Sequence, residues 1–577
     1  MRRFKLFSFI LIGLLTLQPA AFVCAQQTAA GGAANANAPK AAPALKPIVP
    51  SSAVRKAAER ITEKQLKEYL YYIASDAMEG RDTPSRGLDE TARFIAEHLT
   101  KAKLKPAGDE GTYFQRISLR STRVDPNKTT ARMGEQEFRL GTDFLPGGRR
   151  GGEASGALVY VGHGWIVRSK NIDSYRGLDV RDKLVVISGN GMALPAGLTR
   201  EEINALPAGD WESPISYAQK NGAAGLLLIP QRFERAWRAG RRAIANSAYS
   251  VEKLEDETAR ALNQTGSMLP AIIPSAEMVE ALFAGEQTTG ADIMRTTLAG
   301  NPVQGFALRE DKRLSFSVSL NSSTATTQNV VAVLEGSDPV LKNEYVALGA
   351  HYDHVGVGVE VDGDRIYNGA DDDGSGTTAL LAMAEALARG TRPKRSVLFV
   401  WHCGEEKGLW GSDYFTNYPT VPLEQVVAQI NIDMIGRSKK PGDTNPRNRM
   451  LTGPNEIYVV GSRVLSTELG DLNERLNRGY LNLDFNYHYD RPNDPEALWT
   501  RSDHFNYARK GVPIVFFFNG VHEDYHRPSD TPDKIDYQKL LNVTRTIFVL
   551  ATEVANAPKR PFVDKQLPPG MSTRDNR

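Results

Sequence analysis

Two adjacent glutamates, Glu405 and Glu406, follow shortly after the apolar run Val397-Leu398-Phe399-Val400. Branched and aromatic residues without a polar break are typical of a parallel strand that is buried on both faces. Two carboxylates held side by side at the mouth of such a strand repel each other and lose hydration. A bound cation would offset both effects, so the pair predicts a metal site whose other ligands lie elsewhere in the chain.

Histidines and carboxylates also stand at the ends of other apolar segments. They are His351 after YVALGA, Asp433 after VVAQINI, His526 beyond PIVFFF, and Asp371, Asp372 and Asp373 in the loop that opens the next predicted helix. Ligands of parallel sheets bind beyond the carboxyl ends of the strands, where these residues would gather. Histidine and carboxylate donors without cysteine suit zinc and, less selectively, manganese or cobalt. One zinc needs about three protein ligands, so this larger set predicts two metal ions that share a carboxylate.

The elements that must position these residues alternate along the second half of the chain. Strands are predicted at residues 329–336, 345–351, 396–401, 426–433 and 513–518, and a helix at residues 376–389 between the second and the third. Two further helices are predicted near residues 61–73 and 88–102. Alternating strands and helices indicate an α/β fold, with a mostly parallel, mixed sheet that is flanked by helices on both faces.

A different pattern separates the first helices from these strands. From about residue 151 to residue 230, short apolar strands such as ALVYVGHG, KLVVISGN and AAGLLLIP alternate with glycine-rich turns. Such a pattern indicates a compact, β-rich domain inserted into the first fold. We place its boundaries at residues 146 and 310, which leaves residues 56–145 and 311–558 for the domain that carries the metal ligands.

The N-terminus has the composition of a secretory signal peptide, which we assign to residues 1–25. Basic residues precede an apolar run at residues 6–17, and Val23-Cys24-Ala25 supplies the cleavage site. Residues 26–55, mostly Ala, Gly, Asn and Pro, are predicted to form a flexible linker, and residues 559–577 a polar tail. The protein is therefore expected to be exported, to the periplasm or the extracellular space. Cleavage would leave Cys403 alone, without an internal disulfide.

The composition argues against two classes of partner. The 70 basic and 68 acidic residues give a formal net charge of +2, so charge gives no reason to expect nucleic acid or an anionic membrane surface. Beyond the signal peptide no segment of the sequence is long and apolar enough to cross a bilayer, so no integral membrane segment is expected. A phosphate-binding P-loop and a Gly-x-Ser-x-Gly elbow are also missing from the sequence.

The segment HEDYH, from His522 to His526, matches the zinc-protease pattern HExxH. That pattern requires a helix, which brings both histidines to one face. Here a strand that ends at Gly520 precedes the segment and Pro528 follows it, so a loop is predicted and His522 is not expected to bind metal. The segment GADDDGSG lacks the ligand spacing of an EF-hand calcium loop.

Five motifs together resemble those of the co-catalytic, di-zinc aminopeptidases. In chain order they are His351-Tyr352-Asp353, NGADDDGSG, GEEKGLWGS, INIDMIG and YHRPSDTPDKID. That family includes bacterial leucyl aminopeptidases, glutamate carboxypeptidase II and the transferrin receptor, and the likeness covers roughly residues 60–150 and 325–555. The resemblance implies the zinc-exopeptidase fold. The inserted segment, with LDVRDKLVVI and KNGAAGLLLI, resembles a protease-associated domain.

The resemblance also implies a role for each ligand. Asp372 would bridge two zinc ions, Glu406 and His526 would complete one site, and His351 and Asp433 would complete the other. The carboxylate of Asp353 would accept a hydrogen bond from His351 and orient its ring. A cis peptide bond often follows the bridging aspartate in this family.

This assignment leaves Glu405 free to act as the general base. Glu405 would deprotonate a metal-bridging water and pass the proton to the leaving amine. Tyr525 resembles the tyrosine that, in some relatives, donates a hydrogen bond to the developing oxyanion. The two adjacent glutamates would therefore differ in function, because one binds a metal and the other carries a proton.

The sequence therefore predicts an exported two-zinc exopeptidase, an aminopeptidase that removes N-terminal residues from peptides. On the same fold, a carboxypeptidase or a glutaminyl cyclase is the nearest alternative, and a non-catalytic, receptor-like homologue is another. The complete set of ligands and the base favour an enzyme over a receptor. Residues 470–505 are expected to shape the choice of substrate, with His488 and His504 either in the pocket or in purely structural positions.

Overall fold

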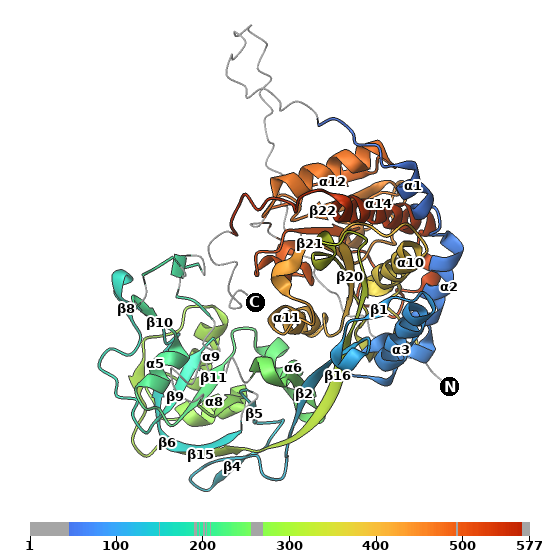
Figure 1. Ribbon diagram of the computed structural model, residues 1–577. Coiled ribbons are helices and arrows are strands. Elements are labelled where there is room, and N and C mark those ends of the chain that lie inside the picture. Colours follow the sequence, from blue (N-terminus) through green and yellow to red (C-terminus); the bar gives the residue numbers. More distant parts are fainter. Residues whose placement is uncertain are drawn as a thin grey trace, which may run out of the picture. The chain divides into compact units, whose positions relative to one another are not determined.

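The structure is a computed structural model of the chain (Figure 1). It describes residues 45–148, 151–189, 193–195, 197–199, 202–203, 205–207, 209–255, 269–491, 494 and 496–567. The predicted signal peptide lies outside the described residues, as do most of the predicted linker and the end of the predicted tail. Helix α1 (Ser52–Ala58) begins inside the segment predicted to be linker, because the Ser51 side chain caps it by accepting the N–H of Val54. This helix therefore overlaps the last residues of the predicted linker, and the linker itself stays a prediction.

A mixed sheet carries the strands predicted after residue 329. Its central strands are parallel neighbours in the order β20 (Ser396–His402), β17 (Tyr345–His351), β21 (Val426–Ile432) and β24 (Ile514–Phe518). Beyond β20 lie β16 (Leu320–Leu334), β2 (Phe114–Val124), β12 (Ala248–Val251) and the short β1 (Lys105–Pro106), and beyond β24 lie β22 (Glu456–Val460) and β23 (Asp484–Asn486). The mixed sheet confirms the prediction: β16 and β22 run antiparallel to their central neighbours, and β22 and β23 pair in parallel at one edge.

Helices pack on both faces of this sheet because its central strands are apolar on both sides. Along β20, Val397, Phe399 and Trp401 belong to one buried cluster, whereas Leu398 and Val400 belong to another. The first cluster includes residues of α1, α2 (Glu63–Ile73), α3 (Arg86–Lys101), α10 (Gly376–Ala388), α12 (Thr467–Gly479) and α14 (Tyr537–Asn556), and the second includes residues of α11 (Trp410–Asn417) and α13 (His504–Ala508). Each buried Val, Leu or Phe side chain contributes about 1.5–3 kcal/mol, so burial on both faces fixes the central strands firmly.

A second sheet is built from residues that lie between β2 and β16, two strands that pair with each other. Its strand order is β4 (Gln136–Phe138), β3 (Thr130–Met133), β15 (Arg313–Val318), β6 (Gly152–Tyr160), β9 (Leu184–Ser188), β11 (Gly225–Ile229), β13 (Ala271–Pro274) and β5 (Phe144–Pro146), with β14 (Phe306–Ala307) on β6. The helices of this stretch are α5 (Pro214–Lys220), α6 (Phe233–Ala245), α8 (Ala276–Phe283) and α9 (Gly290–Leu298). β3, β4 and β15 pair in this sheet although they lie outside the boundaries predicted at residues 146 and 310, and the division into domains stays a prediction.

Two small antiparallel sheets complete the described strands. One has the order β10 (Trp211–Glu212), β7 (Ile166–Val167) and β8 (Ile172–Asp173), and the other is the hairpin of β18 (Gly356–Val361) and β19 (Asp364–Tyr367). The helices predicted at residues 61–73, 88–102 and 376–389 correspond to α2, α3 and α10. Within the described ranges, no helix combines the length and the apolar character needed to cross a bilayer.

Candidate metal centre

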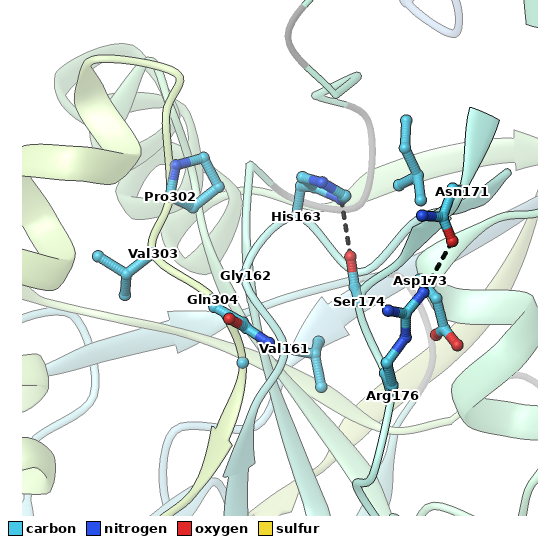
Figure 2. A pocket seen from close by; sticks show the side chains of 12 residues that line it. Val161, Gly162, His163, Asn171, Asp173, Ser174, Arg176, Pro302, Val303 and Gln304 are labelled. Carbon is cyan, nitrogen blue, oxygen red and sulfur yellow. Dashed lines mark hydrogen bonds between the residues drawn. The ribbon is translucent and has the colours of Figure 1, made fainter.

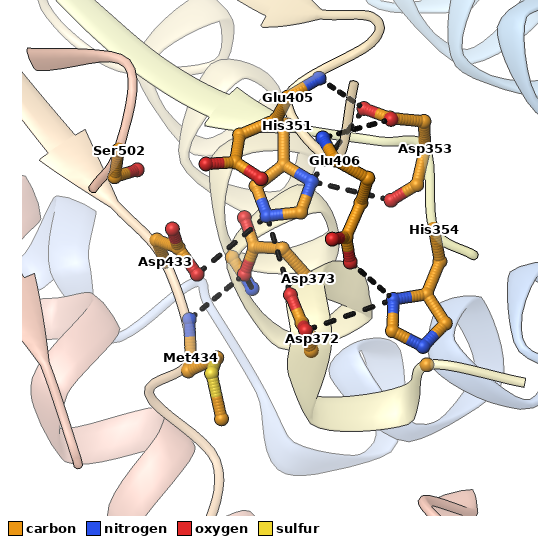
Figure 3. Close-up of polar contacts among 12 residues, drawn as sticks. His351, Asp353, His354, Asp372, Asp373, Glu405, Glu406, Asp433, Met434 and Ser502 are labelled. Carbon is orange, nitrogen blue, oxygen red and sulfur yellow. Dashed lines mark hydrogen bonds and ion pairs between the residues drawn. The ribbon is translucent and has the colours of Figure 1, made fainter. Parts of the chain in front are cut away.

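The predicted ligands meet at the carboxyl edge of the four parallel strands. His351 is the last residue of β17, Glu406 lies in the turn after β20, Asp433 follows β21 directly, and His526 lies in the loop after β24. Asp372 lies in the irregular turn that leads into α10, and the peptide bond after it is cis, as the resemblance implied. Because neighbouring parallel strands end at the same edge of a sheet, these distant parts of the sequence converge. Figure 3 shows several of these side chains turned toward one another.

The two oxygens of Asp372 face two different groups of donors. Asp372 Oδ1 lies 3.3 Å from His351 Nε2, which in turn lies 3.6 Å from Asp433 Oδ1. Asp372 Oδ2 lies 3.1 Å from His526 Nε2, which lies 3.0 Å from Glu406 Oε1. A carboxylate with one oxygen in each group is placed to bridge two metal ions. The structure thus brings all five predicted ligands together, in the two sets that the resemblance implied.

The facing atoms of these groups lack hydrogen-bond partners in the described part of the chain. They are His351 Nε2, Asp372 Oδ2, Glu406 Oε1 and His526 Nε2, and all four atoms are buried. A buried polar atom without a partner costs about 1–3 kcal/mol, so several of them at one point require a common partner. Imidazole nitrogens and carboxylate oxygens are donors that bind zinc. The residues present therefore fit zinc.

Opposite charges dominate the electrostatics of this centre. Burial acts to raise the pKa of Asp372, but contacts with His351 and His354 lower it well below its usual range. Burial acts to lower the pKa of His526, but Asp372 and Glu406 raise it to about 10. The carboxylates therefore favour a positive charge on the imidazoles. A metal cation would take the place of those protons, since imidazole binds metal in its neutral form.

Glu405 lines the pocket in front of these groups, together with Asp372 and Asp433. Burial raises the pKa of Glu405 well above its usual range, and His351 acts against this shift. The neighbouring carboxylates of Glu406 and Asp433 raise the pKa further. A half-buried carboxyl beside the ligands, with a pKa raised in this way, has the properties of a group that accepts and releases a proton.

Asp353 contacts the site differently from the prediction. His351 Nδ1 lies 3.2 Å from the main-chain oxygen of Asp353 and 3.6 Å from its carboxylate Oδ1, so the hydrogen bond of the ring is to the main chain. The carboxylate of Asp353 instead accepts the backbone N–H groups of Glu405 and Glu406, at 3.1 Å and 3.4 Å. Asp353 therefore orients the turn that carries both glutamates, a contact between distant segments that the local sequence does not reveal.

Tyr525 also lines the pocket, next to a predicted ligand. Its ring stacks on that of His526 with the ring centroids 3.9 Å apart, and Arg501 donates a hydrogen bond to its Oη at 3.4 Å. Burial, followed by the charges of Asp372 and Glu406, raises the pKa of Tyr525 well above its ordinary value. The phenol therefore stays protonated and able to donate a hydrogen bond.

The segment from His522 to His526 forms a loop of turns and not a helix, as predicted. His522 Nε2 lies 3.1 Å from Asp371 Oδ2, and His522 belongs to neither donor group of the described residues. His526 reaches its donor group from the other end of this loop. The HExxH spacing is therefore unrelated to a helical zinc site in this chain.

The pocket has an apolar wall, formed by Met434, Leu498, Phe516, Phe518 and Val521. The space between the lining side chains measures about 350 Å³, part of it open to solvent. His504 is fully buried and stacks on Phe516 with the ring centroids 4.5 Å apart, and His488 is exposed. Neither histidine is among the described residues that line the pocket.

Sequence reasoning missed His354, which lies at the same centre. His354 is fully buried, and its Nδ1 atom lies 2.9 Å from Glu406 Oε1. The histidine stands three residues after His351, in the segment HYDHVG, just beyond the end of β17. A second histidine so close to a predicted ligand is the sequence feature that could have identified it.

A buried arginine, Arg81, was also missed. Its guanidinium donates hydrogen bonds to main-chain oxygens of Ile73, Tyr352, Asn368 and Gly369, at 2.7–3.0 Å. These bonds join the segment after β17 to the segment that precedes the aspartate turn. Arg81 therefore fixes two of the segments that carry ligands, and its distance along the chain from both explains why no local pattern marks it.

Comparison with known proteins gives a match for the part of the chain that carries the donors. Residues 329–551 match the sequence profile of Peptidase family M28. Leucine aminopeptidase 2 from Trichophyton rubrum is 28% identical over 268 residues, which are 42% of this chain and 48% of that protein. Probable leucine aminopeptidase 2 from Aspergillus fumigatus is 27% identical over 289 residues, 44% of this chain and 51% of that protein. The chain thus spans about half the length of the relatives that it matches.

Solved structures of similar arrangement include two aminopeptidases. An aminopeptidase from Aneurinibacillus sp. strain AM-1 aligns with a TM-score of 0.49 and 17% identity, over 89% of this chain and 100% of that one. BSAP, a zinc aminopeptidase from Bacillus subtilis, aligns with a TM-score of 0.44 and 16% identity, over 87% and 98% of the two chains. Porphyromonas gingivalis glutaminyl cyclase aligns with a TM-score of 0.30 and 20% identity, over 39% and 77%.

Proposed function

We propose that this chain is a zinc-dependent aminopeptidase, a hydrolase that removes N-terminal residues from peptides, since residues 329–551 match the profile of Peptidase family M28. The observation that carries the proposal is the convergence of the predicted ligands in two groups around Asp372, with Glu405 in the adjoining pocket. The leucine aminopeptidases that match part of the chain support this substrate class.

Each donor group is proposed to hold one zinc ion. His351, Asp372 and Asp433 would hold one, and Asp372, Glu406 and His526 the other. Zinc ions bound there would polarise the carbonyl of the scissile bond and acidify a nearby water. Manganese and cobalt suit the same donors less selectively.

Glu405 acts as the general base. One of its carboxylate oxygens takes a proton from the attacking water, whose oxygen bonds to the carbonyl carbon of the N-terminal residue. When the carbon–nitrogen bond breaks, Glu405 gives the proton to the nitrogen of the leaving amine. Burial raises the pKa of Glu405, which suits a group that must first bind this proton and then release it.

Tyr525 acts on the carbonyl oxygen. As negative charge develops on that oxygen, the hydroxyl of Tyr525 donates a hydrogen bond to it. Arg501 already donates to Tyr525 Oη, so one lone pair of the phenol is occupied and its hydrogen remains available. The raised pKa of Tyr525 keeps that hydrogen in place.

The pocket supports cleavage from the amino end of the peptide. The apolar wall accepts an apolar first side chain. Arg501 is the one cation among the described lining residues, and it favours a carboxypeptidase as the second candidate because guanidinium binds a terminal carboxylate well.

A substrate panel for the zinc-loaded protein separates these candidates. The substrates are a leucyl tripeptide with free ends, its N-acetylated form, its C-terminal amide and a peptide with N-terminal glutamine. We expect cleavage of the free and amidated peptides, no cleavage of the acetylated one, and loss of activity with a chelator while the fold is retained. If the acetylated peptide is cleaved and the C-terminal amide is not, the result would favour a carboxypeptidase. Release of ammonia from the peptide with N-terminal glutamine would favour a glutaminyl cyclase.

Export is part of the proposal, because residues 1–25 have the composition of a signal peptide. The secreted protein is expected to begin at Gln26, which N-terminal sequencing measures directly. A lipid-modified Cys24 at the new N-terminus would contradict this cleavage.

A further inference from the structure

His354 completes one of the two donor groups. Its Nδ1 atom lies 2.9 Å from Glu406 Oε1 and 3.7 Å from Asp372 Oδ2, and its ring meets that of His526 edge-on with the centroids 5.5 Å apart. Figure 3 shows the His354 ring facing Glu406 and Asp372 from the segment after β17. The imidazole thus approaches the same point as the other donors of this group.

The distances between these donors lie within a few tenths of an ångström of those in a tetrahedral zinc site. His354 Nδ1, Asp372 Oδ2, Glu406 Oε1 and His526 Nε2 are separated by 2.9, 3.7, 3.1 and 3.0 Å along four of their six pairs. Zinc bonds of about 2.0–2.2 Å place tetrahedral ligand atoms about 3.3–3.6 Å apart. One candidate ligand atom from each of the four residues lies within 4.8 Å of the others.

The same four atoms are buried without a hydrogen-bond partner among the described residues. The surroundings also hold the ring of His354 in this position. Its backbone N–H donates to the main-chain oxygen of Arg81, and a side chain on Gly369 would lie 2.5 Å from the ring. Gly369 has a φ of +59°, a conformation that favours glycine, so the backbone leaves this space for the imidazole.

The other donor group has a different composition. It holds His351, Asp372 and Asp433, with no fourth histidine or carboxylate found for it among the described residues. Asp372 and Asp433 line the substrate pocket beside Glu405, whereas none of the described lining residues is His354, Glu406 or His526. The three-donor group therefore reaches the pocket through Asp433 and the shared Asp372.

We propose that His354 is a fourth protein ligand of one zinc ion, so that the two ions are held unequally. The ion held by four protein donors occupies a closed site, as structural zinc does, and the ion held by three keeps an open position. The closed ion binds more tightly, and the open ion faces the substrate. This inference rests on the zinc pair of the proposed function.

The variant His354→Gln tests the inference on the purified, zinc-loaded protein. Glutamine can still donate a hydrogen bond to Glu406 but is a poor zinc ligand, so the variant separates ligation from positioning. Competition with a chromophoric chelator measures the dissociation constants of the two ions. In the wild type we expect two classes of zinc with different dissociation constants. In the variant, the dissociation constant of the tighter class should rise by more than about 10- to 100-fold, which is the cost of losing a residue that only hydrogen-bonds to a metal ligand.

The matched control is His522→Gln. His522 is also buried at this edge of the sheet, but it contacts Asp371 and belongs to neither donor group. Both zinc classes should persist in this control. Unchanged binding of both ions in His354→Gln would overturn the inference, and so would an equal loss in the two variants.

Cobalt substitution of the wild type gives a second test that does not depend on how the variant folds. Two sites of unequal coordination should fill in sequence, with different visible absorption for the first and the second equivalent of cobalt. Simultaneous filling with a single spectrum would overturn the inference. A wild type that binds two zinc ions in two classes but cleaves none of the peptides would contradict the proposed function and leave the role of His354 intact.

Discussion

Two hollows of this molecule, one at the metal centre and one near β7 and β8, contain similar polar side chains but differ in whether those side chains have hydrogen-bond partners. The hollow near β7 and β8 is lined by histidine, serine, aspartate and arginine side chains (Figure 2). There, His163 Nδ1 accepts the backbone N–H of Trp165 at 3.0 Å and lies 3.0 Å from Ser174 Oγ. Arg176 donates to Asn171 Oδ1, also at 3.0 Å. The polar groups of this hollow are therefore engaged with each other.

At the metal centre the facing polar atoms have no such partners among the described residues. The histidines show the difference. Burial lowers the pKa of His163 to about 4, whereas at the metal centre Asp372 and Glu406 overcome burial and raise the pKa of His526 to about 10. A hollow lined by histidine, serine and aspartate is therefore not enough to identify a catalytic site. Convergent donors that the protein itself leaves unsatisfied are the stronger indication.

Removal of the shared carboxylate should have the largest effect. Asp372→Asn takes one anionic ligand from both donor groups at once, so we expect loss of both zinc ions and a fall in turnover beyond the about 10⁴-fold worth of a single positioned base. Metal analysis and peptide hydrolysis measure the two effects. Asp173→Asn, in the other hollow, is the control and should retain zinc and activity. Two zinc ions in Asp372→Asn would contradict the bridging position.

The two histidines of HEDYH should behave differently. His526→Ala removes a donor from one group, so one zinc ion should be lost and turnover should fall by about a hundredfold or more. His522→Ala removes a neighbour of Asp371 and should keep both ions. Metal content per folded chain decides the matter. Equal loss of zinc in the two variants would indicate that both histidines bind metal.

Arg81→Lys should weaken metal binding by about 10- to 100-fold, because lysine cannot reproduce the fork of hydrogen bonds that joins two ligand-bearing segments. Arg395 is an equally buried arginine that instead contacts Glu344 and the main chain of Val554. Arg395→Lys should lower thermal stability similarly but leave zinc affinity unchanged. Zinc affinity measured at equal folded fraction separates the two. An equal change of zinc affinity in both variants would mean that Arg81 only stabilises the fold and does not position the ligands.

Substitutions in the other hollow should have the smallest effect. His163→Ala and Ser174→Ala remove groups that contact each other, so zinc content should stay the same and turnover should change within about twofold, or about 0.5 kcal/mol. Steady-state kinetics on the substrate panel measures this. A large loss of turnover with zinc retained would mean that the second hollow also takes part in the function.

The parts of this site that follow strands could be predicted from sequence, because buried parallel strands are apolar runs and their ends must share an edge. His351, Glu406 and Asp433 were found in this way. The contacts of Arg81 and of the Asp353 carboxylate could not, since both join segments far apart in the sequence and depend on packing. His354 was missed although it stands three residues after His351 in HYDHVG, because that spacing alone does not show which group of donors the second histidine faces.

The proton-transfer role of Glu405 is the central claim, and the pair Glu405→Gln and Glu406→Gln tests it most directly through turnover and zinc content measured on the same samples. Glutamine keeps the size of the side chain but cannot accept a proton at neutral pH. Glu405→Gln should retain two zinc ions while turnover falls by at least about a hundredfold, and Glu406→Gln should lose or weaken one ion and partly recover with added zinc. The claim would be contradicted if Glu405→Gln lost zinc while Glu406→Gln retained both ions. Unchanged turnover in both variants would also contradict it.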